Sequence, residues 1–277
     1  MSLMKRLSNG WEMGLTSLRI IRDNPKLMFF PVFSSLALLL VLASFLGGLA
    51  ATWGLDFDTW AANANMEGLE YILLFAYYLV NYFVIVFFNV GLVYAARQIF
   101  EGKDVTIADG LNFSLSRIGA ILQWAILAAT VGVVLKTIQE RVGWVGQIIV
   151  GLIGMVWSIA TYFVVPVLAF ENLSPLAAVK RSGALIKEKW GESLAANFGF
   201  ALFYLLGYLV IIVGGILIGY TLHPVAGIAM GILAALILHA AIAAAQTVFL
   251  AAAYQHMNDE PYGDFNGETL DSMFIKK

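Results

Sequence analysis

Six long apolar runs, separated by short segments that carry almost all of the charge, constrain the fold of this chain more than any other feature. Each run is long enough to cross a hydrocarbon core of about 30 Å, which takes about 20 residues of helix. Because lipid offers the backbone no hydrogen bonds, runs of this length must satisfy their own backbone as helices. The runs cover Leu27–Trp53, Tyr71–Ala96, Ile118–Leu135, Gln147–Phe170, Leu194–Tyr220 and Val225–Tyr254.

The composition excludes a water-soluble fold. The chain is 61% hydrophobic and only 12% charged, whereas a soluble domain is about 25% charged. A soluble chain of 277 residues could not cover this apolar surface, so the bilayer must act as its solvent. The absence of cysteine excludes disulfides, thiolate metal sites and cysteine catalysis.

The basic residues predict the orientation, because cytoplasmic loops carry an excess of lysine and arginine. In a six-crossing topology, all but two of the 16 basic residues lie on one side, the exceptions being Lys136 and Arg141. We therefore expect both termini to be cytoplasmic, with the first span a retained signal anchor. Basic residues placed at membrane interfaces give nucleic-acid binding no support.

Three segments on the basic side predict amphipathic helices along the inner membrane interface. Start signals support two of them: Ser174 precedes Pro175, and Thr106 with Asp109 resembles a capping box in which Asp replaces the usual Glu. The apolar residues that recur at helical spacing are Leu7, Trp11, Leu15 and Leu18, then Ile107, Leu111 and Leu115, and then Leu176, Val179, Ile186 and Trp190.

The predicted fold is an all-α polytopic membrane helical bundle. Its six transmembrane helices form three hairpins, and each hairpin follows a cytoplasmic interfacial amphipathic helix. We expect a single transmembrane domain over residues 1–256, with repeat units at about 7–97, 106–171 and 174–256. An acidic cytoplasmic tail over 257–277 could be disordered, or it could dock on the bundle or on a partner.

Some small residues and prolines inside the runs predict local geometry. Gly215 with Gly219, and Gly227 with Gly231, have the GxxxG spacing of closely packed membrane helices. Pro31 and Pro166 lie inside predicted spans, and each should bend its helix because it removes a helical hydrogen bond.

The segment after the fourth run resembles a known group. Its residues follow the Pro…Glu…Pro…Ala…Lys-Arg-Ser…Leu pattern of uncharacterised prokaryotic six-helix membrane proteins. That group includes membrane segments fused to glycerophosphodiester phosphodiesterases, but this chain has no room for their catalytic barrel. The residues that carry the resemblance are Pro166, Glu171, Pro175, Ala178, Lys180-Arg181-Ser182 and Leu185.

Leu7–Glu12, Val80–Asn89 and the tail more narrowly resemble the domain-of-unknown-function 6159 family. The resemblance covers nearly the whole chain. It implies a six-helix fold and a place in the prokaryotic cytoplasmic (inner) membrane, and it implies no mechanism.

Polar groups inside the runs are the candidate cavity or interhelix positions: Asn81, Thr161, His239 and Gln246. His239 is the clearest, because an ionisable group near the middle of a span is costly to place there. It could line a cavity as a proton or substrate site, or it could be a neutral histidine bonded to a neighbouring helix. We prefer the second interpretation, since no carboxylate lies at a comparable depth.

A second candidate set consists of the basic residues Lys180, Arg181, Lys187 and Lys189. They could bind anionic lipid headgroups, each contributing about 1 kcal/mol. Glu171 could also form a salt bridge with Lys180 or Arg181 that holds the interfacial helix against the bundle, and both interpretations can be true.

Nothing in the sequence indicates catalysis. There is no phosphate-binding glycine loop, no metal-ligand cluster and no paired nucleophile and base. We therefore expect no cofactor and no enzymatic activity. The expected function is a scaffold or accessory subunit that binds membrane lipids, a protein partner or a second copy of the chain. The alternative is a transporter or channel with a central cavity on a pseudo-threefold axis.

Overall fold

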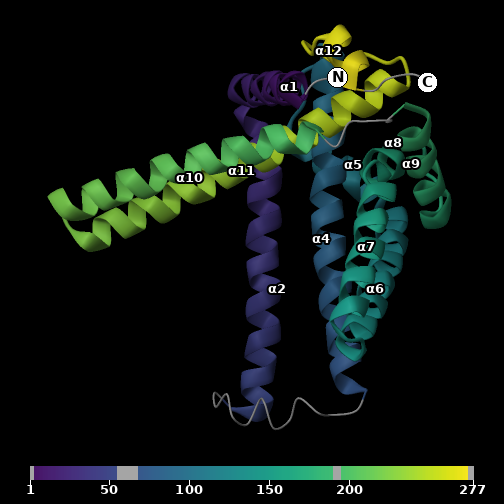
Figure 1. The fold of residues 1–277 in the computed structure, drawn as a ribbon, viewed down its shortest axis with the longest axis vertical. Coiled ribbons are helices and arrows are strands. Elements are labelled where there is room, and N and C mark those ends of the chain that lie inside the picture. The colour runs from purple at the N-terminus through teal and green to yellow at the C-terminus, as the bar shows by residue number, and fades with distance from the viewer. Residues whose placement is uncertain (1–2, 55–67, 190–194, 274–277) are drawn as a thin grey trace. The chain divides into compact units, whose positions relative to one another are not determined.

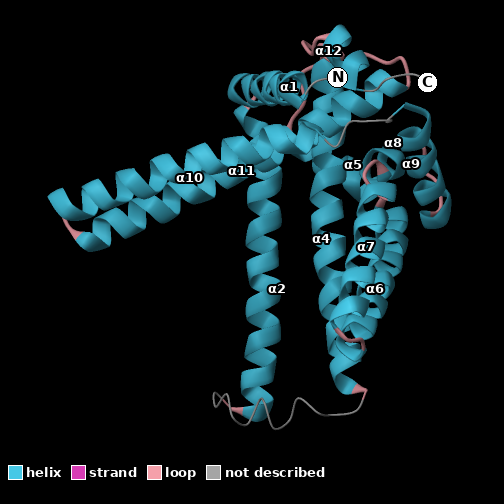
Figure 2. Cartoon of the chain, in the orientation of Figure 1, coloured by secondary structure: helices cyan, strands magenta, loops and turns pink. Residues whose placement is uncertain are grey.

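The computed structural model is helical over the residues that it describes, which are 3–54, 68–189 and 195–273 (Figures 1 and 2). No strand occurs within these ranges. The elements in chain order are α1 (Leu3–Asp23), the 3₁₀ helix η1 (Pro25–Met28), α2 (Phe29–Trp53), α4 (Leu69–Phe100), α5 (Ile107–Ser116), α6 (Ile118–Arg141), α7 (Trp144–Ala160), α8 (Val164–Phe170), α9 (Pro175–Lys189), α10 (Ala195–Thr221), α11 (Pro224–Met257) and α12 (Gly267–Met273).

Six helical stretches are long and apolar enough to cross a membrane, which confirms the number and the approximate positions of the predicted spans. The fourth is interrupted between Ala160 and Val164, in agreement with the irregularity expected at Pro166. By contrast, α2 continues through Pro31 without interruption, so the break expected there does not occur. Pro31 lies in the first turn of α2, where backbone N–H groups make no intrahelical hydrogen bond, so its missing N–H costs the helix nothing. The six stretches are Pro25–Thr52, Tyr71–Phe100, Ile118–Arg141, Trp144–Phe170, Phe200–Thr221 and Pro224–Met257.

The chain divides into two compact units. Unit 1 comprises Met1–Val32, Leu92–Gly110 and Leu185–Lys277. Unit 2 comprises Phe33–Gly91 and Leu111–Ala184.

Unit 1 is organised around α10 and α11, which pack along each other (Figure 1). Glycines permit the close approach, because a Cβ on Gly227 would lie 2.6 Å from the backbone nitrogen of Gly219. The turn between the two helices is short, and His223 Nδ1 accepts a hydrogen bond from the Val225 N–H (3.2 Å), capping α11 ahead of Pro224. These contacts confirm close packing at three of the four predicted glycines, whereas a Cβ on Gly231 would meet nothing within 4 Å.

Helix α1 packs against both α10 and α11 in unit 1. The Trp11 indole stacks on the Phe203 ring with centroids 4.1 Å apart and an interplanar angle of 11°. Met13 and Ser17 are fully buried, while Leu15 is exposed. The buried side of α1 therefore differs from the stripe predicted from the sequence, because it includes Met13 and Ser17 and leaves Leu15 exposed.

The described part of the acidic tail also belongs to unit 1. Phe265 is buried, with its ring centroid 6.1 Å from that of Phe100 and 6.4 Å from that of Phe249. Leu270 of α12 is fully buried. The sequence left open whether the tail is disordered or docked, and residues 258–273 dock on the rest of unit 1. Residues 274–277 lie outside the described ranges.

Unit 2 contains α6, α7, α8 and most of α2, α4, α5 and α9. Phe45 and Tyr77 meet edge to face (5.3 Å between centroids), which joins α2 to α4. Trp124 and Trp157 stack at 6.0 Å and 4°, which joins α6 to α7. Aromatic contacts thus supply much of the packing between these apolar helices.

The predicted capping box at the start of α5 is confirmed. The Thr106 hydroxyl and the Thr106 N–H both donate to Asp109 Oδ2, at 2.7 and 2.8 Å. The Asp109 N–H donates back to Thr106 Oγ1 at 3.2 Å. An aspartate can therefore replace the usual glutamate of this motif.

Candidate functional site

His239 lies at the middle of α11, and its hydrogen-bond partner is the hydroxyl of Tyr204 on α10. The Tyr204 oxygen is 3.5 Å from His239 Nδ1, and the two ring centroids are 5.9 Å apart. The His239 side chain is otherwise exposed. The helix periodicity of the sequence could not identify Tyr204, because the pairing depends on how α10 and α11 lie against each other.

Two further polar groups extend this side of the α10–α11 pair. Tyr208 follows Tyr204 by one helical turn, and the two rings stack at 6.1 Å and 14°. Gln246 follows His239 by two turns on the same side of α11 and is half-buried. Four polar side chains of unit 1 therefore occupy neighbouring turns of two membrane helices.

Asn81 and Thr161 lie in unit 2. The Asn81 amide donates to the Tyr77 carbonyl at 2.7 Å, and the Thr161 hydroxyl donates to the Trp157 carbonyl at 2.8 Å. Each bond stays within its own helix. The four predicted cavity positions are thus divided between the two units, and a common cavity around them stays a prediction.

The basic candidates differ in their surroundings. Arg181 donates through Nε to both oxygens of Glu171, at 2.9 and 3.1 Å, so the salt bridge considered from the sequence is formed by this residue. Lys180 and Lys187 are exposed and make no ion pair within the described residues. Lys189 ends α9, and its side chain lies outside the described part of the chain.

The interruption of the fourth span is held by a residue of the Lys180-Arg181-Ser182 motif to which sequence analysis gave no role. Ser182 of α9 is fully buried, and its hydroxyl oxygen accepts a hydrogen bond from the Phe163 N–H at 3.0 Å. Phe163 lies between α7 and α8, three residues before Pro166. Ser182 shares a buried helical stripe with Ala178 and Leu185, and this spacing was the signal that could have located it.

A polar cluster joins the end of α4 to the tail in unit 1. Arg97 pairs with Glu101 Oε1 through Nε (3.0 Å) and with Glu260 Oε2 through Nη2 (3.1 Å). Gln255 is fully buried beside them; with its amide nitrogen toward Glu260 it donates to that carboxylate, and its oxygen accepts from Arg97 Nε at 3.3 Å. A hydrogen bond from the Lys103 ammonium lowers the pKa of the Glu101 carboxyl, and a hydrogen bond from Arg97 lowers it to a smaller extent.

Among the described residues, no group of three or more histidine, aspartate or glutamate side chains is placed to hold a metal ion. Arg181 is instead paired with Glu171, and Arg97 forms a small cluster with Glu101 and Glu260. The predicted polar positions inside the spans, Asn81, Thr161, His239 and Gln246, carry two amides, a hydroxyl and an imidazole, which are groups that can form hydrogen bonds.

Six helices of the described ranges are long and apolar enough to cross a membrane, which is the property of a multi-pass helical membrane protein. The chain belongs to the family of unknown function DUF6159, which matches residues 68–264, a range that includes the second to the sixth span. This match confirms the narrower of the two resemblances over residues 68–264, whereas Leu7–Glu12 and the tail from Phe265 onward lie outside the matched range. No curated protein and no solved structure matches the chain.

Proposed function

We propose that this protein is a non-catalytic scaffold or accessory subunit of the prokaryotic cytoplasmic membrane, with both termini cytoplasmic, and that it binds lipids or a membrane protein partner. The observation that carries the proposal is the two-sided burial of α1, α5 and α9. Each helix buries a serine completely and exposes a leucine on another side. The serines are Ser17, Ser114 and Ser182 at 0% exposure, and the leucines are Leu15, Leu115 and Leu176 at 43%, 52% and 65%.

This pattern supports an interfacial position for the three helices. The serine side is held against the protein, while the leucine side remains free to enter the boundary between headgroups and acyl chains. In water, exposure of these three leucine side chains would be unfavourable, whereas at a membrane surface their burial among acyl chains lowers the free energy. The same sides are available to the apolar surface of a membrane partner.

Two serine contacts support the repeated arrangement of an interfacial helix and a hairpin. The Ser114 hydroxyl donates to the Phe87 carbonyl of α4 at 2.7 Å, and Ser182 accepts from the Phe163 N–H. Each serine comes eight residues after the residue that precedes its helix, Thr106 or Ser174, and each bonds to the backbone of the preceding span. The close packing of α10 with α11 and of α6 with α7 fits two of the three hairpins.

The lysines of α9 are the proposed contacts for anionic lipid headgroups. Lys180 and Lys187 are seven residues apart and lie on one side of the helix, and both are exposed. Arg181 is occupied by Glu171, so it contributes to this surface less than its charge alone implies. Lys189 extends the same segment.

Native mass spectrometry in mild detergent, with phosphatidylglycerol and phosphatidylethanolamine present, tests this proposal. We expect retained anionic lipid or a stoichiometric protein partner. The double variant Lys180→Gln, Lys187→Gln should lose anionic lipid, whereas Lys136→Gln, Arg141→Gln removes the same charge elsewhere and should retain it. Wild-type protein with neither lipid nor partner would overturn the proposal, and equal lipid loss in both variants would remove the assignment to α9.

A transporter or channel is the second candidate function, favoured by the Tyr204–His239 contact inside the spans. Flux of a solute panel into proteoliposomes tests it. His239→Ala should abolish any flux while the protein stays monodisperse. No flux for wild-type protein across the panel would dispose of this candidate.

A further inference from the structure

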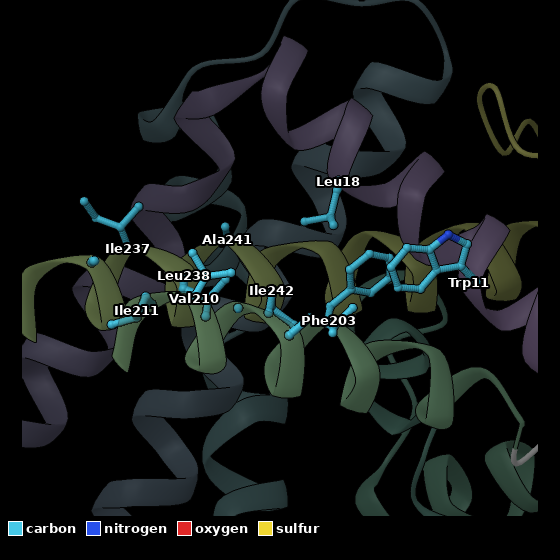
Figure 3. A pocket seen from close by; sticks show the side chains of 12 residues that line it. Trp11, Leu18, Phe203, Val210, Ile211, Ile237, Leu238, Ala241 and Ile242 are labelled. Atoms are coloured by element: carbon cyan, nitrogen blue, oxygen red, sulfur yellow. The ribbon is translucent and has the colours of Figure 1, made fainter. Parts of the chain in front are cut away.

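An apolar groove of about 640 Å³ lies where α1 packs against α10 and α11 in unit 1. Its lining residues are glycine, aliphatic or aromatic, and none of them carries a charge. Figure 3 shows the groove between side chains of the three helices, including Trp11 and Leu18 of α1, Phe203 of α10 and Ala241 of α11. A groove with this lining suits a hydrocarbon ligand.

The walls of the groove are held in place by close packing. A Cβ on Gly14 would collide with the Phe203 ring, so the glycine lets α1 lie directly on α10. A Cβ on Gly207 would lie 2.5 Å from Leu238 Cδ2, so this glycine lets a side chain of α11 pack onto α10. Phe203 also stacks on Trp11. The groove is therefore enclosed by helices in direct contact with one another.

The groove lies at the depth of lipid acyl chains. Its α10 wall runs from Phe203 to Ile211, within the membrane-crossing stretch Phe200–Thr221. At 1.5 Å per residue, this wall covers depths of about 5 to 17 Å from the start of that stretch. One leaflet contributes about half of a hydrocarbon layer of about 30 Å. The medium that meets the open side of the groove is therefore hydrocarbon.

Basic residues continue the α1 wall of the groove. Arg22 follows Leu18 by one helical turn, so the two residues lie on the same side of α1, and Arg19 neighbours Arg22 at a spacing of three. Arg19 is exposed and makes no ion pair within the described ranges. Arg22 Nε donates to Asp23 Oδ1, but the two side chains are 74% and 54% exposed. Water competes with such a pair, so the guanidinium stays available to a phosphate.

We propose that this groove holds one acyl chain of an anionic phospholipid, whose phosphate accepts hydrogen bonds from Arg19 and Arg22. The apolar walls select the hydrocarbon chain, and the basic residues select the charge of the headgroup. The inference rests on the proposed lipid-binding function, because it names the lipid and a place for it. It uses none of the lysines of α9.

The chain contains no cysteine, so a single cysteine can carry a bimane fluorophore without background. Leu206→Cys places the fluorophore on the groove, and Leu205→Cys is the matched control. Both leucines are exposed and adjacent in α10, but Leu205 does not line the groove. Each labelled protein is reconstituted with phosphatidylglycerol and phosphatidylcholine, and one lipid at a time carries bromine on its acyl chains. Bromine quenches the fluorophore on contact, so the two quenching levels report which lipid is preferred at each position.

At Leu206→Cys we expect phosphatidylglycerol to be preferred about fivefold or more, as basic residues beside its phosphate imply. At Leu205→Cys we expect no comparable preference. Adding Arg19→Gln and Arg22→Gln should abolish the preference at position 206. Equal preferences at the two positions would overturn the proposal, and so would an absence of quenching at position 206 by either lipid.

A change in the groove itself gives a second readout. Ala241→Phe fills the groove from α11 and should remove the preference at position 206, whereas Ala201→Phe lies on an exposed part of α10 outside the groove and should retain it. Equal effects of the two changes would refute the groove as the binding place. If Leu206→Cys is not monodisperse, Val210→Cys on the groove and Leu209→Cys beside it repeat the comparison one turn further along α10.

Native mass spectrometry of the wild-type protein separates this inference from the proposed function. Retained phosphatidylglycerol together with equal preferences at positions 205 and 206 would keep lipid binding and remove the groove site. Neither retained lipid nor a partner, together with equal preferences, would remove both.

Discussion

The Ser182 hydroxyl oxygen accepts a hydrogen bond from the Phe163 N–H, 19 residues earlier, at 3.0 Å. Pro166 carries no N–H and its ring would clash with the carbonyl four residues before it, so the fourth span opens between α7 and α8. A backbone N–H freed at a buried position needs a hydrogen-bond acceptor. A side chain of the following helix therefore stabilises the interruption.

Replacing Ser182 tests this relationship. Ser182→Ala should destabilise the protein by about 1–3 kcal/mol, because it removes the buried hydrogen bond between the Phe163 N–H and the Ser182 hydroxyl. The measurement is reversible unfolding in detergent. Ser116→Ala is the matched control: its hydroxyl bonds locally to the Phe113 carbonyl and is exposed, so its effect should be small. Equal effects of the two changes would refute the role given to Ser182.

The contact between α10 and α11 depends on Gly227. A Cβ there would collide with the Gly215 and Gly219 backbones, which cannot move aside as a flexible side chain can. Gly227→Ala should therefore destabilise the protein by about 1–3 kcal/mol through overpacking. Gly231→Ala adds the same methyl group where nothing lies within 4 Å, and it should be neutral or stabilising. The measurement is the Tm of each variant relative to wild type, which should fall for Gly227→Ala and stay the same or rise for Gly231→Ala.

Docking of the tail depends on Phe265. Phe265→Ala removes a buried ring that contacts Phe100 and Phe249, at a cost of about 3–5 kcal/mol to the docked state. A cysteine at Leu270, which is fully buried, should be labelled slowly in the parent chain and quickly after Phe265→Ala. The exposed Glu268→Cys should react quickly in both backgrounds. Continued protection of position 270 would show that other contacts hold the tail.

The capping box of α5 should make stability depend on pH. Hydrogen bonds from the Thr106 hydroxyl and then from the Thr106 N–H lower the pKa of the Asp109 carboxyl. Because the folded-state pKa lies below the unfolded value of about 3.9, the carboxylate stabilises the fold above that pH. The contribution is lost as the pH falls through the lowered pKa.

The measurement is the Tm of wild type and of Asp109→Asn across the acid range. Wild type should be the more stable at pH about 6, and the gap should narrow below pH about 4. Asp264→Asn changes an exposed aspartate of the tail and should show a smaller gap at every pH. A gap for Asp109→Asn that does not change with pH would mean that the carboxylate charge is irrelevant to the cap.

Local features were predictable to the extent that they depend on nearby residues. The capping box needs only Thr106 and Asp109, three residues apart, and the interruption at Pro166 follows from the proline itself. The burial of α1 was less predictable, because Met13 and Ser17 are covered by other helices while Leu15 is exposed. Helix periodicity identifies an apolar side, but it does not say which side meets protein and which meets lipid.

The amino-acid sequence alone determined the solvent of this protein and the number of its membrane spans, because apolar runs of such length are stable only as helices in hydrocarbon. Only the tertiary structure decided which polar groups meet: Tyr204 with His239, Ser182 with Phe163, and Arg97 with Glu260. Each pair joins residues on different segments of the chain. Their distances depend on how helices cross and on where glycines let them approach, and spacing along the chain contains neither quantity.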